Sequence, residues 1–302
     1  MRRVRLAGVH SHANPLVRSA RGRLTRKVPW ALVLLRDEGD GVIAIGQASH
    51  AWISGQLARA WGNDRFAAPE PREEVCLAAQ QHDVGMAEWD LRPSLNPATG
   101  RPRSFMELPV DVHVALWSAA PAKLFSQSRY AALLVSMHGV ALQSRRDLAK
   151  LTARERELVR AYLDGQRKLQ DALIERLDAD SELLARNQRL VWTWDSISLA
   201  LCLRWPSVRL DDVPALGGPL ELVLSANSDD RFTLQPWPFA ADRLELHCEG
   251  RPLRGHFEAE TELHETLERA RARTLTFALA PPARPRRSPA RPASNREGER
   301  AG

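Results

Sequence analysis

The segment Ala79-Gln80-Gln81-His82-Asp83-Val84-Gly85 places a histidine directly before an aspartate at the end of an apolar, helix-prone stretch. Imidazole and carboxylate side chains bind zinc, iron, manganese and similar ions. Neighbouring residues on a helix point about 100° apart, so both reach one ion only if the helix is distorted or the side chains converge. Further ligands must come from other helices. The dipeptide therefore predicts a helical cage around a divalent metal.

Four other candidate ligands lie on helix-prone segments on both sides of this dipeptide. The stretches around His138 and Asp195 are apolar and are expected to be buried. An unpaired buried carboxylate is costly, and no Lys or Arg lies within four residues of Asp195, so a metal would supply its partner. Without a metal, His138 would be a hydrogen-bonded core residue and His113 an exposed one. The predicted ligands are His50, His82, Asp83, His113, His138 and Asp195.

The rest of the chain predicts a mainly α fold, a helical bundle with a small accessory antiparallel β-sheet. Residues 28–280 are expected to form one globular domain, with a helical core over about 48–205 and an accessory β region over about 206–256. An N-terminal hairpin around the turn 37–41 is expected to join the C-terminal strands, and a closing helix is expected at about 258–275. Thr152-Ala-Arg-Glu155 is typical of a capping box that opens a long polar helix.

Charge and composition limit the partners. Residues 1–27 carry eight Lys and Arg and no acid, and residues 281–302 carry six Arg and two Glu, so these flanks hold +12 of a chain whose net charge is +6. The body is thus about −6, and both flanks are expected to be disordered tails. We expect a small-molecule substrate, no nucleic-acid partner and no membrane partner, and a cytoplasmic location. Three scattered cysteines predict reduced thiols.

The order His … His-Asp … His … His … Asp resembles the HD superfamily, which is named after the adjacent pair. More closely, the chain is similar to a bacterial family described only as domain of unknown function 3891. The matching segments, over roughly residues 29–250, are Gln47-Ala-Ser-His50-Ala, Gly55-Gln-Leu-Ala58, Trp61-Gly62-Asn63, His82-Asp-Val-Gly85 with Trp89-Asp90, Pro93, Thr99-Gly-Arg-Pro102 with Phe105, Tyr130-Ala-Ala-Leu-Leu134, Ser136-Met-His138, and Asp195 with Ser198-Leu199.

The superfamily resemblance implies an all-helical ligand cage. By position, His50, His82, Asp83 and Asp195 match its four common ligands, and His113 with His138 matches the two extra histidines of its two-metal branches. Those branches include HD-GYP cyclic-dinucleotide phosphodiesterases, nucleotide phosphodiesterases and mixed-valent di-iron oxygenases. The lysine that usually follows His-Asp-x-Gly in the HD-GYP pattern is Met86 here, and no Gly-Tyr-Pro follows. This departure argues against cyclic-dinucleotide hydrolysis.

The loop that leaves the His-Asp helix is the predicted substrate pocket. Arg92 and Arg101 are candidates for gripping phosphate or carboxylate because guanidinium groups match such oxyanions, and Trp89 is a candidate pocket wall. The alternative for the two arginines is that they are solvated charges on the loop. The alternative for Trp89 is ordinary core packing. Glu88 and Asp90 are candidates for a general base or for partners of a ligand histidine.

Three functions remain open at this point. The first is a metal-dependent hydrolase that acts on a phosphoester or nucleotide through water activated by one or two ions of Mn, Fe or Zn. The second is a di-iron oxygenase that uses the same six ligands. The third is a non-catalytic metal or ligand sensor. The sequence ranks them in this order.

Overall fold

The computed structural model describes residues 34–104 and 107–283. The expected tails at 1–27 and 281–302 lie outside these residues, except for 281–283, and so does most of the first expected strand. Helices take 49% of the described residues. The described helices are α1 (Gln47–Ala60), α2 (Arg72–Gln81), α3 (Ala87–Leu91), α4 (Val110–Ala119), α5 (Arg129–Gln143), α6 (Ala153–Leu177), α7 (Ser181–Cys202) and α8 (Glu260–Arg269), with 3₁₀ turns η1 (Val84–Met86), η3 (Pro121–Leu124) and η4 (Leu148–Lys150).

Side-chain caps define where three of these helices begin. The Thr152 hydroxyl accepts from the Glu155 N–H while the Glu155 carboxylate accepts from the Thr152 N–H, which confirms the predicted capping box of α6. Asp180 caps α7 and Ser128 caps α5 in the same manner, each by accepting a backbone N–H three residues later. Two of the three capped helices, α5 and α7, carry candidate ligands. Each cap fixes the residue at which its helix begins, and so fixes which side of the helix the ligand is on.

The sheet is much larger than expected. Seven strands form one sheet in the order β1-β2-β8-β9-β7-β6-β5, and every neighbouring pair is antiparallel except β7 and β9. The strands are β1 (Leu34–Asp37), β2 (Gly41–Ile45), β5 (Ser207–Val213), β6 (Leu220–Ser228), β7 (Arg231–Gln235), β8 (Leu244–Arg254) and β9 (Arg273–Ala280); β3 (Leu95–Asn96) and β4 (Arg101–Pro102) form a separate pair.

The predicted fold class, mainly α with a small accessory sheet, is therefore wrong. The N-terminal hairpin does join the C-terminal strands, because β2 pairs with β8, but the result is a large, curled mixed sheet of seven strands that resembles half of a barrel. The expected closing helix also differs. Helix α8 ends at Arg269, and Arg273–Ala280 alternates buried and exposed side chains as strand β9. Its period of two places Leu275, Phe277 and Leu279 in the core.

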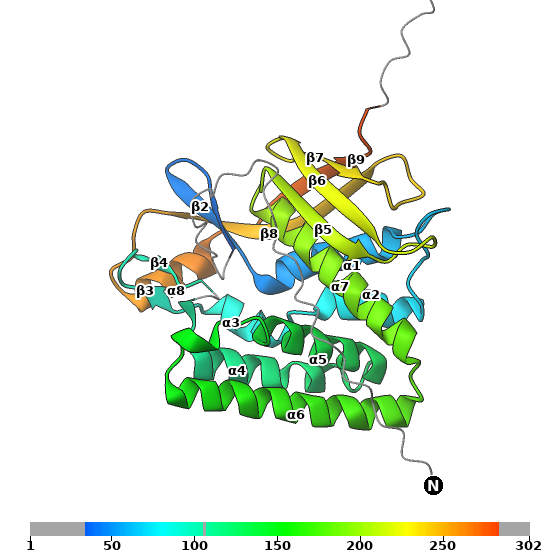
Figure 1. The fold of residues 1–302 in the computed structure, drawn as a ribbon. Coiled ribbons are helices and arrows are strands. Elements are labelled where there is room, and N and C mark those ends of the chain that lie inside the picture. The colour runs from blue at the N-terminus through cyan, green and yellow to red at the C-terminus, as the bar shows by residue number, and fades with distance from the viewer. Residues whose placement is uncertain (1–33, 105–106, 284–302) are drawn as a thin grey trace, which may run out of the picture.

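The helices and the sheet pack as successive layers (Figure 1). Helices α4, α5 and α6 form one outer layer, the sheet forms the other, and α1 and α7 lie between them, where they contact β8 and β5 respectively. One continuous apolar core joins these layers and includes Trp61, Trp194, Phe232 and Phe277. Every candidate metal ligand thus lies on the helical side of a shared core.

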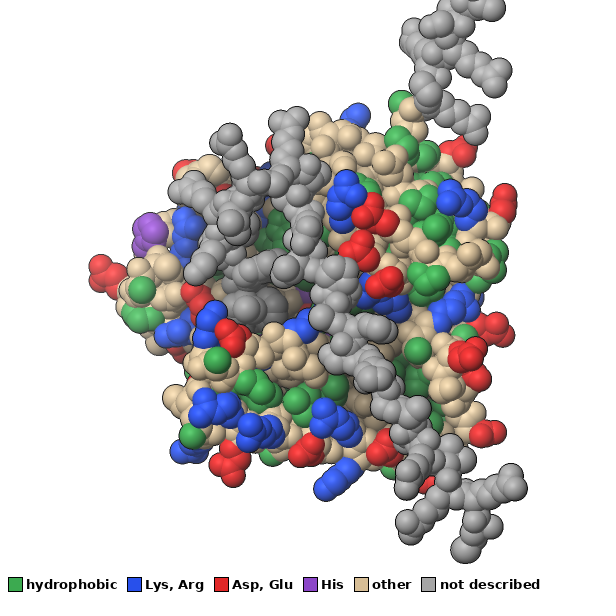
Figure 2. Space-filling model, viewed as in Figure 1, with side chains coloured by type: hydrophobic (Ala, Val, Ile, Leu, Met, Phe, Trp, Pro, Cys, Tyr) green, Lys and Arg blue, Asp and Glu red, His purple; other side chains and the backbone are tan. Residues whose placement is uncertain are grey.

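The described surface shows mixed charge. On the face drawn in Figure 2, Lys and Arg side chains alternate with Asp and Glu side chains. Among the described residues, no helix is long and apolar enough to cross a membrane. The three cysteines are buried and form no disulfide, as predicted.

Candidate metal centre

The His82-Asp83 dipeptide lies where α2 ends and the 3₁₀ turn η1 begins. His82 keeps helical backbone angles, whereas Asp83 leaves them at φ −104° and ψ 18°. This break lets the two neighbouring side chains converge instead of pointing 100° apart, as the sequence required. Gly85 lets this turn pack closely against α4, because a Cβ there would lie 2.5 Å from the Leu116 carbonyl oxygen.

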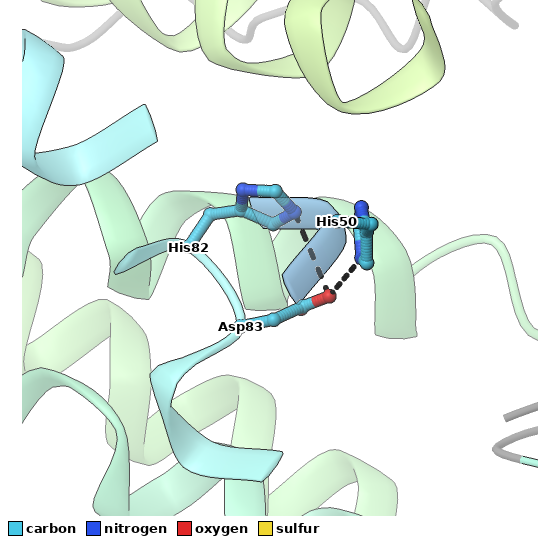
Figure 3. A group of neighbouring side chains, drawn as sticks. All are labelled: His50, His82 and Asp83. Atoms are coloured by element: carbon cyan, nitrogen blue, oxygen red, sulfur yellow. Dashed lines mark hydrogen bonds and ion pairs between the residues drawn. The ribbon is translucent and has the colours of Figure 1, made fainter. Parts of the chain in front are cut away.

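Helix α1 brings His50 to the dipeptide. Its Nε2 lies 2.7 Å from Asp83 Oδ2, and His82 Nε2 lies 3.5 Å from the same oxygen (Figure 3). The two helices approach closely because residue 55 is glycine, where a Cβ would lie 2.6 Å from Gln80 Cβ. His50, His82 and Asp83 therefore form one buried group whose ligand atoms lie within 4.8 Å of one another.

His82 also belongs to a second group of three residues. The Nε2 atom of His82 lies 3.3 Å from Asp195 Oδ1 on α7, and His138 Nε2 on α5 lies 3.7 Å from Asp195 Oδ2. His82, His138 and Asp195 also place one ligand atom each within 4.8 Å of the others. Five of the six predicted ligands, contributed by α1, the end of α2, α5 and α7, thus meet around His82.

Hydrogen bonds fix the protonation pattern of His50. The Ser198 hydroxyl donates to the Asp195 carbonyl at 2.8 Å, so its oxygen accepts from His50 Nδ1 at 2.9 Å. In a neutral imidazole with the proton on Nδ1, Nε2 carries a lone pair. This lone pair faces the Asp83 carboxylate at 2.7 Å, so a proton or a cation must lie between two groups that would otherwise repel.

His82 repeats this arrangement. Its Nδ1 donates to the Ala79 carbonyl at 2.8 Å, which turns Nε2 toward Asp83 and Asp195. That buried Nε2 makes no well-aligned hydrogen bond. A backbone carbonyl that fixes the far nitrogen of an imidazole is a typical support for a metal-ligating histidine. The residues of the centre therefore fit a divalent cation.

The electrostatics of the cluster point the same way. Burial lowers the pKa of His82, but attraction to Asp83 and Asp195 outweighs it and raises the pKa to about 9. Burial raises the pKa of Asp83, but His82 and His50 outweigh it and lower that pKa to about 2. For His138, burial dominates and lowers the pKa to about 4. Two buried carboxylates thus stay ionised and demand compensating positive charge.

A small cavity of about 30 Å³ adjoins these ligands. A volume of that order holds an ion or about one water molecule and is too small for a substrate. Its lining residues are Gln47, His50, Asp83, Met86, Trp117, His138, Leu142, Asp195 and Leu199. Leu142 and Leu199 are half-buried, so they mark the side on which the cavity comes nearest to solvent.

His113 lies apart from the five other predicted ligands. The Arg146 guanidinium donates to His113 Nδ1 at 2.6 Å, and the ring of Trp117 lies between His113 and His138. Burial, reinforced by Arg146, lowers the pKa of His113 to about 4. A neutral His113 that accepts at Nδ1 carries its proton on Nε2 and offers the centre no lone pair.

The two candidate acid–base residues have other positions. Asp90 Oδ2 accepts from the Ala48 N–H at 3.1 Å, so it caps the first turn of α1, two residues before His50. Burial, with a smaller contribution from Asp83, raises the pKa of Asp90 to about 8. Glu88 is exposed and pairs with Lys123 at 2.8 Å.

The candidate substrate residues lie away from the ligand groups. Trp89 is half-buried and packs against two small apolar clusters that include Val42 and Met86. Arg92 is exposed. Arg101 lies 3.6 Å from Asp37 and lines a separate cavity of about 1090 Å³ between β1, β4 and the end of α7. None of these three side chains lines the cavity at the centre.

The sequence names Trp117 as one of several tryptophans that could wall a pocket, but it did not assign Arg145 or Trp192 to the site. Trp117 lines the cavity, and Arg145 stacks on Trp192 beside His138. The available signal was helical spacing. Arg145 follows His138 by seven residues, and Trp192 precedes Asp195 by three, so each shares a helix face with a ligand.

Comparison with known proteins gives a family and no activity. No curated protein and no solved structure matches the chain. The model of a family described as "Protein of unknown function (DUF3891)" matches residues 33–255, well over half of the chain. The chain therefore belongs to the DUF3891 family.

Proposed function

We propose that the protein is a metal-dependent hydrolase of HD type that acts on a small phosphoester or nucleotide. The observation that carries the proposal is the convergence of His50 and His82, whose Nδ1 atoms are both held by hydrogen bonds, on the buried carboxylates of Asp83 and Asp195. These four residues would hold one ion of Mn, Fe or Zn. Their order along the chain and their origin on separate helices support the resemblance to the HD superfamily.

The surrounding residues have separate roles in this proposal. His50, His82, Asp83 and Asp195 would hold the ion, which when bound would lower the pKa of a coordinated water to near 7 and so would supply hydroxide at neutral pH. Ser198 and the Ala79 carbonyl hold the imidazoles in orientation. Asp90 holds the first turn of α1, so we assign it a positioning role in place of proton transfer. The buried ring of Trp117 closes the inner side of the cavity.

The placement of His113 favours one ion over two. A di-iron oxygenase of the resembled type needs six protein ligands, and His113 is bound to Arg146 on the far side of Trp117. His138 lies next to Asp195 and would orient that carboxylate toward the ion. The mononuclear hydrolase is therefore the function that this geometry supports best.

Elemental analysis of the purified full-length protein, with the variant His82→Ala/Asp83→Ala, tests the proposal. The wild type should retain about one Mn, Fe or Zn per chain and hydrolyse a member of a phosphoester and nucleotide panel. The variant should lose the metal and this activity together. His247→Ala is the matched control, because His247 is exposed on β8. A double variant that keeps both metal and activity would overturn the proposal.

A further inference from the structure

One face of α5 continues from the metal centre toward the surface. His138 and Leu142 line the cavity, and Arg145 follows Leu142 by three residues, in the turn that ends the helix. Residues spaced by four and three in a helical run lie on the same side. Arg145 is exposed, whereas His138 is 2% exposed. The guanidinium therefore lies at the outer end of a line of side chains that begins at a candidate ligand.

A face of α7 lies opposite this face of α5, across the cavity. Trp192, Asp195 and Leu199 share that face, and the last two line the same cavity. The Arg145 guanidinium lies 3.5 Å from the ring centroid of Trp192, which is 5.7 Å from the ring centroid of His138. Arg145 thus stacks on Trp192, and Trp192 contacts the His138 ring at a tilt of 43°, so the three side chains form a continuous row of contacts from the surface to the centre.

The charge of Arg145 acts on the centre. Burial and Arg189 lower the pKa of Arg145, while the Asp195 carboxylate raises it, so the guanidinium lies within electrostatic range of that ligand. Stacking uses the flat face of a guanidinium, whereas its N–H donors lie in the plane of the group. A stacked arginine therefore holds its donors in a fixed direction, which lowers the entropy lost when an anion binds.

We infer that Arg145, held by Trp192, binds the phosphoryl oxygens of the substrate at the outer side of the metal centre. The inference rests on the proposed function. The cavity of about 30 Å³ accommodates an ion but not a phosphoryl group, so the group must be bound on the side of Leu142 and Leu199. The Arg145 guanidinium lies one turn beyond Leu142, and its fork matches two phosphoryl oxygens. Arg145 is thus proposed for the phosphate-binding role that the sequence suggested for Arg92 and Arg101.

Titration of the metal-loaded full-length protein with inorganic phosphate tests the inference, followed by Trp fluorescence and by calorimetry. The wild type should bind phosphate, and Arg145→Gln should weaken binding by about tenfold or more because a charge-assisted bidentate contact is lost. Arg145→Lys, which keeps the charge and loses the fork, should fall between them. Arg167→Gln on α6, whose side chain is exposed, is the matched control and should bind like the wild type.

Metal content, measured on each sample, separates this inference from the proposed function. Arg145→Gln should keep the metal and melting temperature of the wild type. Equal phosphate affinity in Arg145→Gln and the wild type, at equal metal content, would overturn the role of Arg145 and leave the metal centre intact. Failure of the metal-loaded wild type to bind phosphate would also overturn it. A wild-type protein that holds no metal would overturn the proposed function itself.

Discussion

The helical layers and the curled sheet share one apolar core but differ in chemistry. Both described ligand groups come from α1, the end of α2, α5 and α7, and no residue of β1–β9 belongs to either group. The sheet supports α1 and α7 through β8 and β5. The difference indicates that the sheet holds the ligand helices in place, while the buried charges lie among the helices.

The largest effect should come from the sheet. Phe277→Ala removes a fully buried ring from the central strand β9 and should lower the free energy of unfolding by about 3–5 kcal/mol. Chemical denaturation measures this loss. The folded fraction should keep the metal content of the wild type, because Phe277 belongs to neither ligand group.

Thr276→Ala on the exposed side of β9 is the control and should change stability by less than about 0.5 kcal/mol. If folded Phe277→Ala lost its metal, the separation between a supporting sheet and ligand-bearing helices would be wrong, because the sheet would then influence metal binding directly.

A smaller effect should come from the centre and should depend on pH. In the metal-free protein the pKa of His82 is raised to about 9, so its charged interaction stabilises the fold fully below about pH 6.5 and is lost as pH rises through 9. Asp83, lowered to about 2, contributes above about pH 4 and loses its contribution as pH falls through 2. Metal affinity should rise with pH up to 9, because the ion displaces the His82 proton.

Thermal melts of metal-free wild type and His82→Gln between pH 6 and 9.5 measure this contribution. The difference in melting temperature between the wild type and His82→Gln should shrink as pH rises. The loss of stability in Phe277→Ala should stay constant, because that substitution removes no titrating group. An advantage that does not change across this range would contradict the assigned charge pair.

The smallest effect concerns the cap of α1. Asp90→Ala removes the acceptor for the Ala48 N–H and should cost about 1 kcal/mol, with weaker metal binding because the His50 helix loosens. Asp90→Asn keeps an acceptor oxygen and should recover most of the loss. Glu88→Ala, also on α3 but exposed, should leave stability and metal affinity unchanged. Equal behaviour of the Ala and Asn variants would exclude the capping role.

The helical part could be predicted because its signals are local. Helix α5 lies within the predicted helical core, and Thr152 and Glu155 form the capping box that their spacing indicates. The metal groups could be predicted in part, because buried carboxylates need partners and the order of His and Asp residues limits the choice. His113 could not be placed, since the intervening Trp117 and the bond from Arg146 are tertiary contacts.

The sheet could not be predicted because its pairing is non-local. Strand β9 pairs with β8 and β7, which precede it by tens of residues, and its alternation follows directly on the helical pattern of α8. Strand β5 lies within the expected β region 206–256, but its own bounds could not be predicted because Asp211 and Asp212 interrupt its apolar pattern near a register shift. The role of Asp90 was likewise missed, because its carboxylate caps a helix that begins 43 residues earlier.

The position of β9 also has a consequence for synthesis of the protein. The strand lies between β8 and β7, so among the described strands the groups β1-β2-β8 and β7-β6-β5 are joined in one sheet only through residues 273–280. The family match ends at residue 255, before this strand. A nascent chain on the ribosome therefore exposes two open strand edges until residues 273–280 emerge, and during this interval these edges are open to aggregation.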